Sequence, residues 1–119
     1  MITGAHTIVH ATDAEAARAF FRDVLGLPYV DANNGWLIFE SPPAELAVHP
    51  AGPAENGRTE LYLMCDDLDA TMAELGAKGV EFTSGVTEAR WGLITHLQVP
   101  GAGEIGLYEP RHPTAYDLT

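Results

Sequence analysis

The sequence predicts an α+β protein made of two β-α-β-β-β modules that curl into one cupped, mostly antiparallel sheet. Each half of the chain opens with residues that alternate between apolar and polar, as in a half-buried strand, and then changes to helical spacing. In the first half, His6 lies seven residues before Asp13. In the second half, Glu60 lies seven residues before Asp67, so the two halves share one register.

The first module is expected at residues 5–50 and begins with a strand at 5–11. Thr12 and Glu15 have the spacing of a capping box, in which a hydroxyl and a carboxylate close the start of a helix. The helix that follows carries one apolar stripe and ends at Gly26. Three further strands are expected after turns of the Asn-Asn-Gly and Pro-Pro type, at 29–32, 36–41 and 45–49.

The second module is expected at residues 59–110, after a linker rich in proline, glycine and alanine at 50–58. Its helix is capped by Asp66 or Asp67. Residues 111–119 are expected to form a loose tail, so that the whole chain is a single domain. Four strands are expected in the module, at 60–65, 80–83, 90–99 and 104–109.

The composition limits the classes of function. The formal net charge of −11 argues against nucleic acid and against an anionic membrane surface, because both bind basic proteins. The single cysteine, Cys65, excludes an internal disulfide and is expected to be a buried, inert thiol. The sequence contains neither a signal peptide nor an apolar run of about 20 residues, so a cytoplasmic protein is expected.

Several large or titratable side chains are candidates for a binding site. Trp36, Tyr62 and Met64 are expected to line an apolar pocket suited to an aromatic or polyketide-like ligand, although some of them can equally belong to the core. For Trp91 we favour a place in the core. His96, on a central strand, is a candidate general acid or base or a partner that orients a metal ligand, and a structural role is the alternative.

Three motifs resemble the vicinal oxygen chelate superfamily, which includes glyoxalase I, bleomycin-resistance proteins and extradiol dioxygenases. The first is His-Thr-Ile-Val-His at residues 6–10, followed by an acidic residue and Ala-Phe-Phe-Arg-Asp-Val-Leu-Gly-Leu at 19–27. The second is Ala-Glu-Leu-Gly-Ala-Lys-Gly at 73–79, and the third is Pro-Gly-Ala-Gly-Glu-Ile-Gly-Leu-Tyr-Glu-Pro at 100–110. The resemblance covers roughly residues 5–110 and implies the paired-module fold.

The resemblance also implies a metal site with four ligand positions, which fall on His6, His49, Glu60 and Gly106. The first three can bind a divalent Fe, Zn, Ni, Co or Mn ion, whereas glycine stands where the family usually has glutamate. Glu104 shares a strand face with Gly106 and is a candidate ligand or base, with a surface carboxylate as the alternative. His10 matches a position that often contacts substrate in the family, and a hydrogen-bonded core histidine is the alternative.

Two functions follow from the resemblance. The first is a metalloenzyme, a lyase, isomerase or dioxygenase, whose ion chelates neighbouring substrate oxygens and stabilises an oxyanion. His96 or Glu104 would move the proton in that reaction. The second is a metal-free, bleomycin-resistance-like protein that sequesters a small aromatic or cationic compound. A homodimer is expected in either case, because modules from two chains often complete each cup in this family and a short chain leaves a sheet edge open.

Overall fold

The structure is a computed structural model that describes residues 6–116, and it confirms the α+β class. The elements in chain order are helix α1 (Ala14–Ala19), π-helical turn η1 (Phe20–Val24), strands β1 (Tyr29–Asp31) and β2 (Leu37–Phe39), 3-10 helix η2 (Pro53–Glu55), strand β3 (Tyr62–Met64), helix α2 (Leu68–Ala77) and strands β4 (Thr87–Ala89), β5 (Gly92–Val99) and β6 (Gly103–Pro110). Within this part of the chain, every helix is too short or too polar to cross a membrane.

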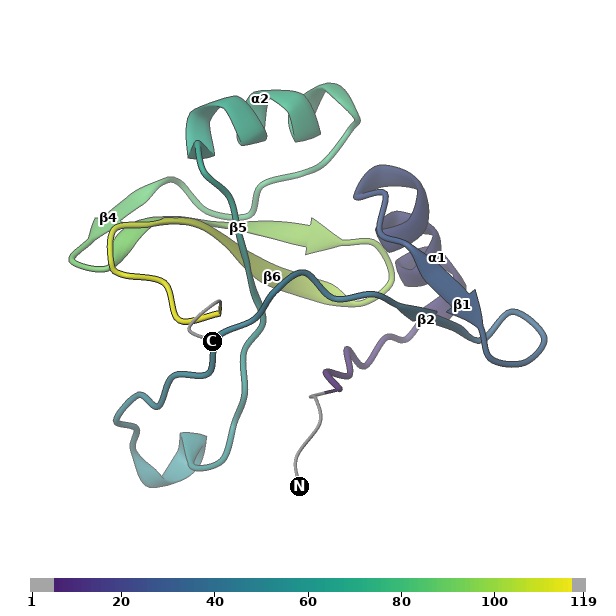
Figure 1. The fold of residues 1–119 in the computed structure, drawn as a ribbon, viewed down its shortest axis with the longest axis horizontal. Coiled ribbons are helices and arrows are strands. Elements are labelled where there is room, and N and C mark those ends of the chain that lie inside the picture. The colour runs from purple at the N-terminus through teal and green to yellow at the C-terminus, as the bar shows by residue number, and fades with distance from the viewer. Residues whose placement is uncertain (1–5, 117–119) are drawn as a thin grey trace.

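The second half of the chain builds a four-stranded sheet in the order β3-β6-β5-β4. β5 is antiparallel to both β4 and β6, whereas β3 is parallel to β6. β1 and β2 form a separate antiparallel hairpin beside α1 (Figure 1). Its predicted Asn-Asn-Gly turn is present, with positive φ angles of 48° at Asn34 and 88° at Gly35.

The hydrophobic core lies on one face of the four-stranded sheet. Alternate residues of β5 and β6 point into it, and α2 covers this face (Figure 1). Leu97 and Val99 on β5 and Leu68 on α2 are completely buried. Ala17 and Phe20 join the same cluster, so the first helix packs on the sheet of the second half. The opposite face is therefore free to carry a site.

Aspartates seven residues after His6 and Glu60 cap the two helices. Asp13 accepts a hydrogen bond from the backbone N–H of Ala16 at 3.0 Å, and Asp67 does the same for Ala70 at 3.0 Å. The predicted capping box is therefore wrong by one residue. The hydroxyl of Thr12 instead donates to the carbonyl of Gly101 at 3.1 Å, which ties the first helix to the β5–β6 turn.

Three predicted strands differ from the observed structure. Residues 6–11 and 45–49 form no regular secondary structure and belong to no sheet, and 80–83 is reduced to one bridge between Phe82 and Leu97. Residue 5 lies outside the described residues. Ile8 is 65% exposed, and Leu46 and Val48 are each 95% exposed. A strand requires a neighbour for its N–H and C=O groups, and residues 6–116 of a single chain offer none at these two positions.

Candidate functional site

The free face of the four-stranded sheet carries a cluster of aromatic side chains that we call the aromatic face: Tyr62, Trp91, His96 and Tyr108. They come from β3, the turn before β5, β5 itself and β6. This clustering makes the face the candidate site, because binding sites are mostly apolar with a few placed polar groups.

Strand register explains why these residues meet. Tyr62 on β3 and His96 on β5 are both paired with Gly106 on the central strand β6. Side chains of directly paired residues lie on the same face of a sheet. Met64 is paired with Tyr108 in the same way, so it too points to this face. The core residues alternate with these positions and point the other way.

The rings pack edge to face around Tyr62 and Tyr108. The ring centroids of Trp91 and Tyr108 are 4.9 Å apart, and those of Tyr62 and Trp91 are 5.7 Å apart, with interplanar angles of 73° and 87°. The centroid of Tyr62 lies 5.9 Å from that of His96. Trp91 remains 39% exposed, so the cluster offers a ring to solvent and to a ligand. Our preference for Trp91 as a core residue finds no support in this placement.

Gly106 has a clear structural reason to lack a side chain. A Cβ atom added there would overlap the ring of Tyr62, whose Cδ1 and Cε1 atoms occupy the space beside the glycine. Any longer side chain, including the glutamate usual in the family, would displace that ring. The position that the resemblance assigns to a fourth metal ligand is thus taken by an aromatic side chain of the site.

Polar groups border the His96 end of the aromatic face. The hydroxyl of Thr83 donates to the Glu104 carboxylate at 2.6 Å, and the Ser84 hydroxyl lies 3.1 Å from Nδ1 of His96. Burial, followed by the Glu60 carboxylate, raises the pKa of the Tyr62 phenol, which keeps it a neutral hydrogen-bond donor. This end can accept hydrogen bonds and positive charge.

The opposite end of the aromatic face is bordered by Glu45 and His112. The phenol of Tyr108 lies 3.3 Å from Glu45 Oε1 and 3.2 Å from His112 Nε2. The imidazole of His112 stacks on the Tyr108 ring, and the two ring centroids are 6.1 Å apart. Burial, followed by Glu45, raises the pKa of Tyr108, so this phenol also stays neutral.

The three residues expected to hold a metal are not brought together in one chain. His6 is exposed in the irregular segment before α1, the His49 ring lies against the carbonyl of Pro50 at 2.8 Å, and Glu60 pairs with Arg58 at 2.8 Å. Among residues 6–116, no three histidine, cysteine or acidic side chains are placed to share an ion. In this arrangement the residues do not fit the metal centre that the resemblance implies.

The remaining predicted site residues divide into two groups. Tyr62, Met64, His96 and Glu104 occupy the free face of the sheet or its rim. His10 is exposed in the segment before α1. Trp36 lies beside the β1–β2 hairpin turn, where the Arg18 guanidinium is 4.8 Å from the centroid of the Trp36 ring. Neither contacts the aromatic face.

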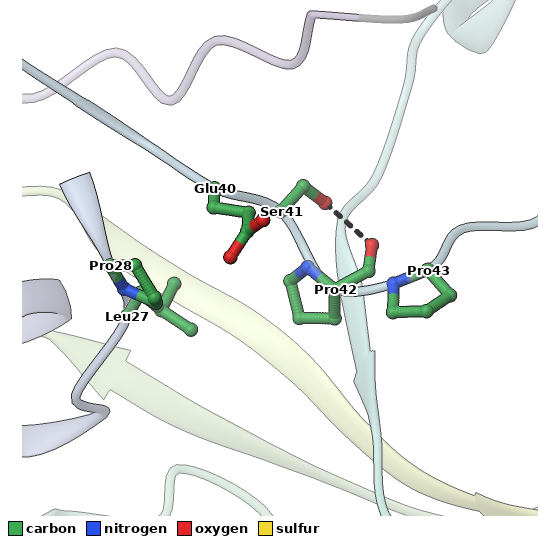
Figure 2. A pocket seen from close by; sticks show the side chains of 6 residues that line it. All are labelled: Leu27, Pro28, Glu40, Ser41, Pro42 and Pro43. Atoms are coloured by element: carbon green, nitrogen blue, oxygen red, sulfur yellow. Dashed lines mark hydrogen bonds between the residues drawn. The ribbon is translucent and has the colours of Figure 1, made fainter. Parts of the chain in front are cut away.

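The hollow drawn in Figure 2 lies elsewhere, between the hairpin and the segment that follows it. It has a volume of about 480 Å³ and is lined by Leu27, Pro28, Glu40, Ser41, Pro42 and Pro43. The Ser41 hydroxyl donates to the carbonyl of Pro42 at 2.9 Å, so it does not point to a ligand. With Glu40 as its other polar side chain, this open hollow lacks converging groups that would orient a molecule.

Sequence reasoning missed Tyr108, Glu45 and His112 as members of the site. Tyr108 could have been found, because it lies two residues after Gly106 and therefore on the same strand face. No local pattern marks Glu45 or His112. Their approach to Tyr108 depends on how two irregular segments fold back over the sheet, as Figure 1 shows for the tail.

The sheet is covered by helices on one face and lined with aromatic and polar groups on the other, which defines an α+β protein with one open sheet face. The chain belongs to the Glyoxalase/Bleomycin resistance protein/Dioxygenase superfamily, whose family description matches residues 4–110. The resemblance found in the sequence is thereby confirmed. Among curated proteins, none matches the chain significantly.

Solved structures of the same superfamily resemble this one. The antibiotic-binding protein TnmS3 of Streptomyces sp. CB03234 is 26% identical, with a TM-score of 0.65 over 92% of this chain and 98% of that chain. A superfamily member from Sphaerobacter thermophilus is also 26% identical, with a TM-score of 0.61 over 91% and 98%. Lactoylglutathione lyase of Agrobacterium tumefaciens, at 20% identity and a TM-score of 0.64 over 90% and 92%, shares the fold.

Proposed function

We propose that this protein binds a flat aromatic small molecule that carries a positive charge, and that it does so without a metal ion. The observation that carries the proposal is the aromatic face, where Trp91 presents a partly exposed ring beside Tyr62 and Tyr108. Aromatic pairs of this geometry contribute about 0.5–1.5 kcal/mol each beyond the area that they bury. A planar ligand would extend this packing.

Charge supports the cationic character of the ligand. Carboxylates stand at both ends of the aromatic face, Glu104 near His96 and Glu45 beside Tyr108. The whole chain has a formal net charge of −11, which favours the approach of cations and disfavours anions. The 26% identity to an antibiotic-binding protein agrees with a sequestering role.

A metalloenzyme is the alternative that the superfamily offers. It requires His6, His49 and Glu60 to converge, and their contacts in a single chain are with solvent, Pro50 and Arg58. Metal analysis of protein purified without a His-tag separates the two functions. Near-stoichiometric Fe, Zn, Ni, Co or Mn that is lost in His6→Ala would replace our proposal with the metalloenzyme.

We further propose that a second copy of this chain covers the two strand-like segments. Residues 6–11 and 45–49 alternate as strands but lack partners, and Leu46 and Val48 are 95% exposed. The radius of gyration is 15.2 Å, against about 13.5 Å for a compact domain of this length. Sedimentation equilibrium should give a dimer, and Leu46→Lys with Val48→Lys should shift it to monomer. A wild-type monomer at high protein concentration would contradict this assignment.

Ligand binding is tested by calorimetric titration with proflavine, a planar tricyclic cation, and with anthracene-2-sulfonate, a planar tricyclic anion. We expect micromolar affinity for proflavine that a chelator does not change, and much weaker binding of the sulfonate. Trp91→Ala should lower the proflavine affinity roughly tenfold, because one aromatic pair is lost.

The matched control is Trp36→Ala, which removes a tryptophan that is 62% exposed and lies beside the hairpin. It should leave the proflavine affinity unchanged. Equal losses in the two tryptophan variants, or no loss in Trp91→Ala, would contradict the assignment of the site to the aromatic face.

A further inference from the structure

The C-terminal tail folds back over the end of the aromatic face. After β6 the chain turns, and the imidazole of His112 stacks on the Tyr108 ring with an interplanar angle of 30°. Tyr108 is only 7% exposed as a result of this and neighbouring contacts. Figure 1 shows the tail on the side of the sheet opposite α2.

Glu45 holds the tail in this position. Its Oε2 accepts a hydrogen bond from the backbone N–H of Ala115 at 2.7 Å, and its Oε1 lies 3.3 Å from the Tyr108 phenol. The Glu45 side chain is 15% exposed, although most of the segment around it is open to solvent. One carboxylate therefore connects its own segment with β6 and with the tail, 63 and 70 residues later in the chain.

Contacts at both ring nitrogens fix the imidazole of His112 in this place. Nδ1 lies 2.8 Å from the carbonyl of Pro113, which can only accept a hydrogen bond. Nε2 lies 3.2 Å from the phenol oxygen of Tyr108, and that phenol lies 3.3 Å from Oε1 of Glu45.

The tail thus places a planar ring on Tyr108, beside a carboxylate. We propose that Glu45 and Tyr108 form the cation-recognition end of the aromatic face, and that His112 occupies this end until a ligand displaces it. This inference rests on the proposed function and adds to it where the charged part of the ligand lies. The ligand class is a planar aromatic cation whose charge reaches Glu45.

Displacement has a measurable consequence. The apparent affinity of a ligand is its intrinsic affinity multiplied by the fraction of molecules in which the tail is open. His112→Ala should raise the proflavine affinity roughly tenfold, the change expected when about nine-tenths of the molecules are closed. Arg111→Lys is the matched control, because the Arg111 side chain pairs with Glu88 on β4 at 2.8 Å, and only its backbone N–H, which lysine keeps, contacts the aromatic face at the carbonyl of Trp91. It should leave the affinity unchanged.

A second variant releases the tail without touching an aromatic side chain. Ala115→Pro removes the N–H group that donates to Glu45, and it should also raise the proflavine affinity. In the His112→Ala background, Glu45→Gln should then lower proflavine affinity roughly tenfold and leave the affinity for anthracene-2-sulfonate unchanged or higher.

NMR signals of the His112 ring provide a reading that needs no ligand. They should show the upfield shift of a ring stacked on tyrosine and should move to free-histidine positions when proflavine is added. Tight proflavine binding with equal affinity in wild type, His112→Ala and Ala115→Pro would overturn this inference and leave the proposed function standing. Absence of proflavine binding in all three would overturn the proposed function, and this inference with it.

Discussion

Replacing Gly106 with alanine tests whether Tyr62 fills the position of the missing side chain. The added methyl group would fall inside the Tyr62 ring, so the ring must swing away from His96 and Trp91. Overpacking of this kind costs about 1–3 kcal/mol. Replacing glycine with alanine also restricts the unfolded chain, and this effect offsets about 0.4–1 kcal/mol of the overpacking cost. The net expectation is a loss of roughly 1–2 kcal/mol of unfolding free energy.

Urea denaturation of the wild type and of Gly106→Ala, at the same protein concentration, measures this loss. Gly76→Ala is the matched control, because Gly76 lies inside α2 with no heavy atom within 4 Å of an added Cβ. It should stabilise the protein by about 0.5–1 kcal/mol. In the Tyr62→Ala background, Gly106→Ala should lose its cost, since the obstructing ring is gone. A destabilisation that stays the same in that background would refute the reasoning.

Three further outcomes follow from the fold. Asp13→Ala and Asp67→Ala should each lower the unfolding free energy by about 1 kcal/mol in urea denaturation, whereas asparagine at either position should largely preserve it. Leu97→Ala, at a completely buried position, should cost about 2–5 kcal/mol in the same assay, and a cost below 1 kcal/mol would contradict its place in the core. Because folding raises the pKa of Tyr62 and Tyr108, the unfolded chain loses these phenol protons at a lower pH than the folded protein does. The contribution of these phenols to the free energy of unfolding should therefore be fully present below about pH 10 and be lost above it. Tyr108→Phe should reduce this alkaline loss. An unchanged pH profile of stability in Tyr108→Phe would count against the raised pKa of Tyr108.

The second module was predicted closely because its local signals agree with its packing. Asp67 caps α2 as expected, and the alternating residues of 90–99 and 104–109 form the two long strands β5 and β6. Both strands also find partners within the chain, so their backbone groups are satisfied. Local pattern and tertiary pairing point to the same structure there.

The first module was predicted less well, although its alternation is equally clear. Residues 6–11 and 45–49 have the strand period but no neighbouring strand within the described part of the chain. The metal set depended on these two segments, because His6 and His49 belong to them. Periodicity determines which face of a strand is apolar, but it does not supply the partner that makes a strand.

The sequence alone was sufficient for the fold class, the superfamily, an aspartate cap on the second helix and the shared strand face of Tyr62 and Met64. Those features depend on residues close together in the chain. The tertiary structure alone decided that Tyr62 covers Gly106 and that Glu45 and His112 meet at Tyr108. These contacts join residues up to 63 positions apart, and their formation depends on how the sheet and the two irregular segments fold together.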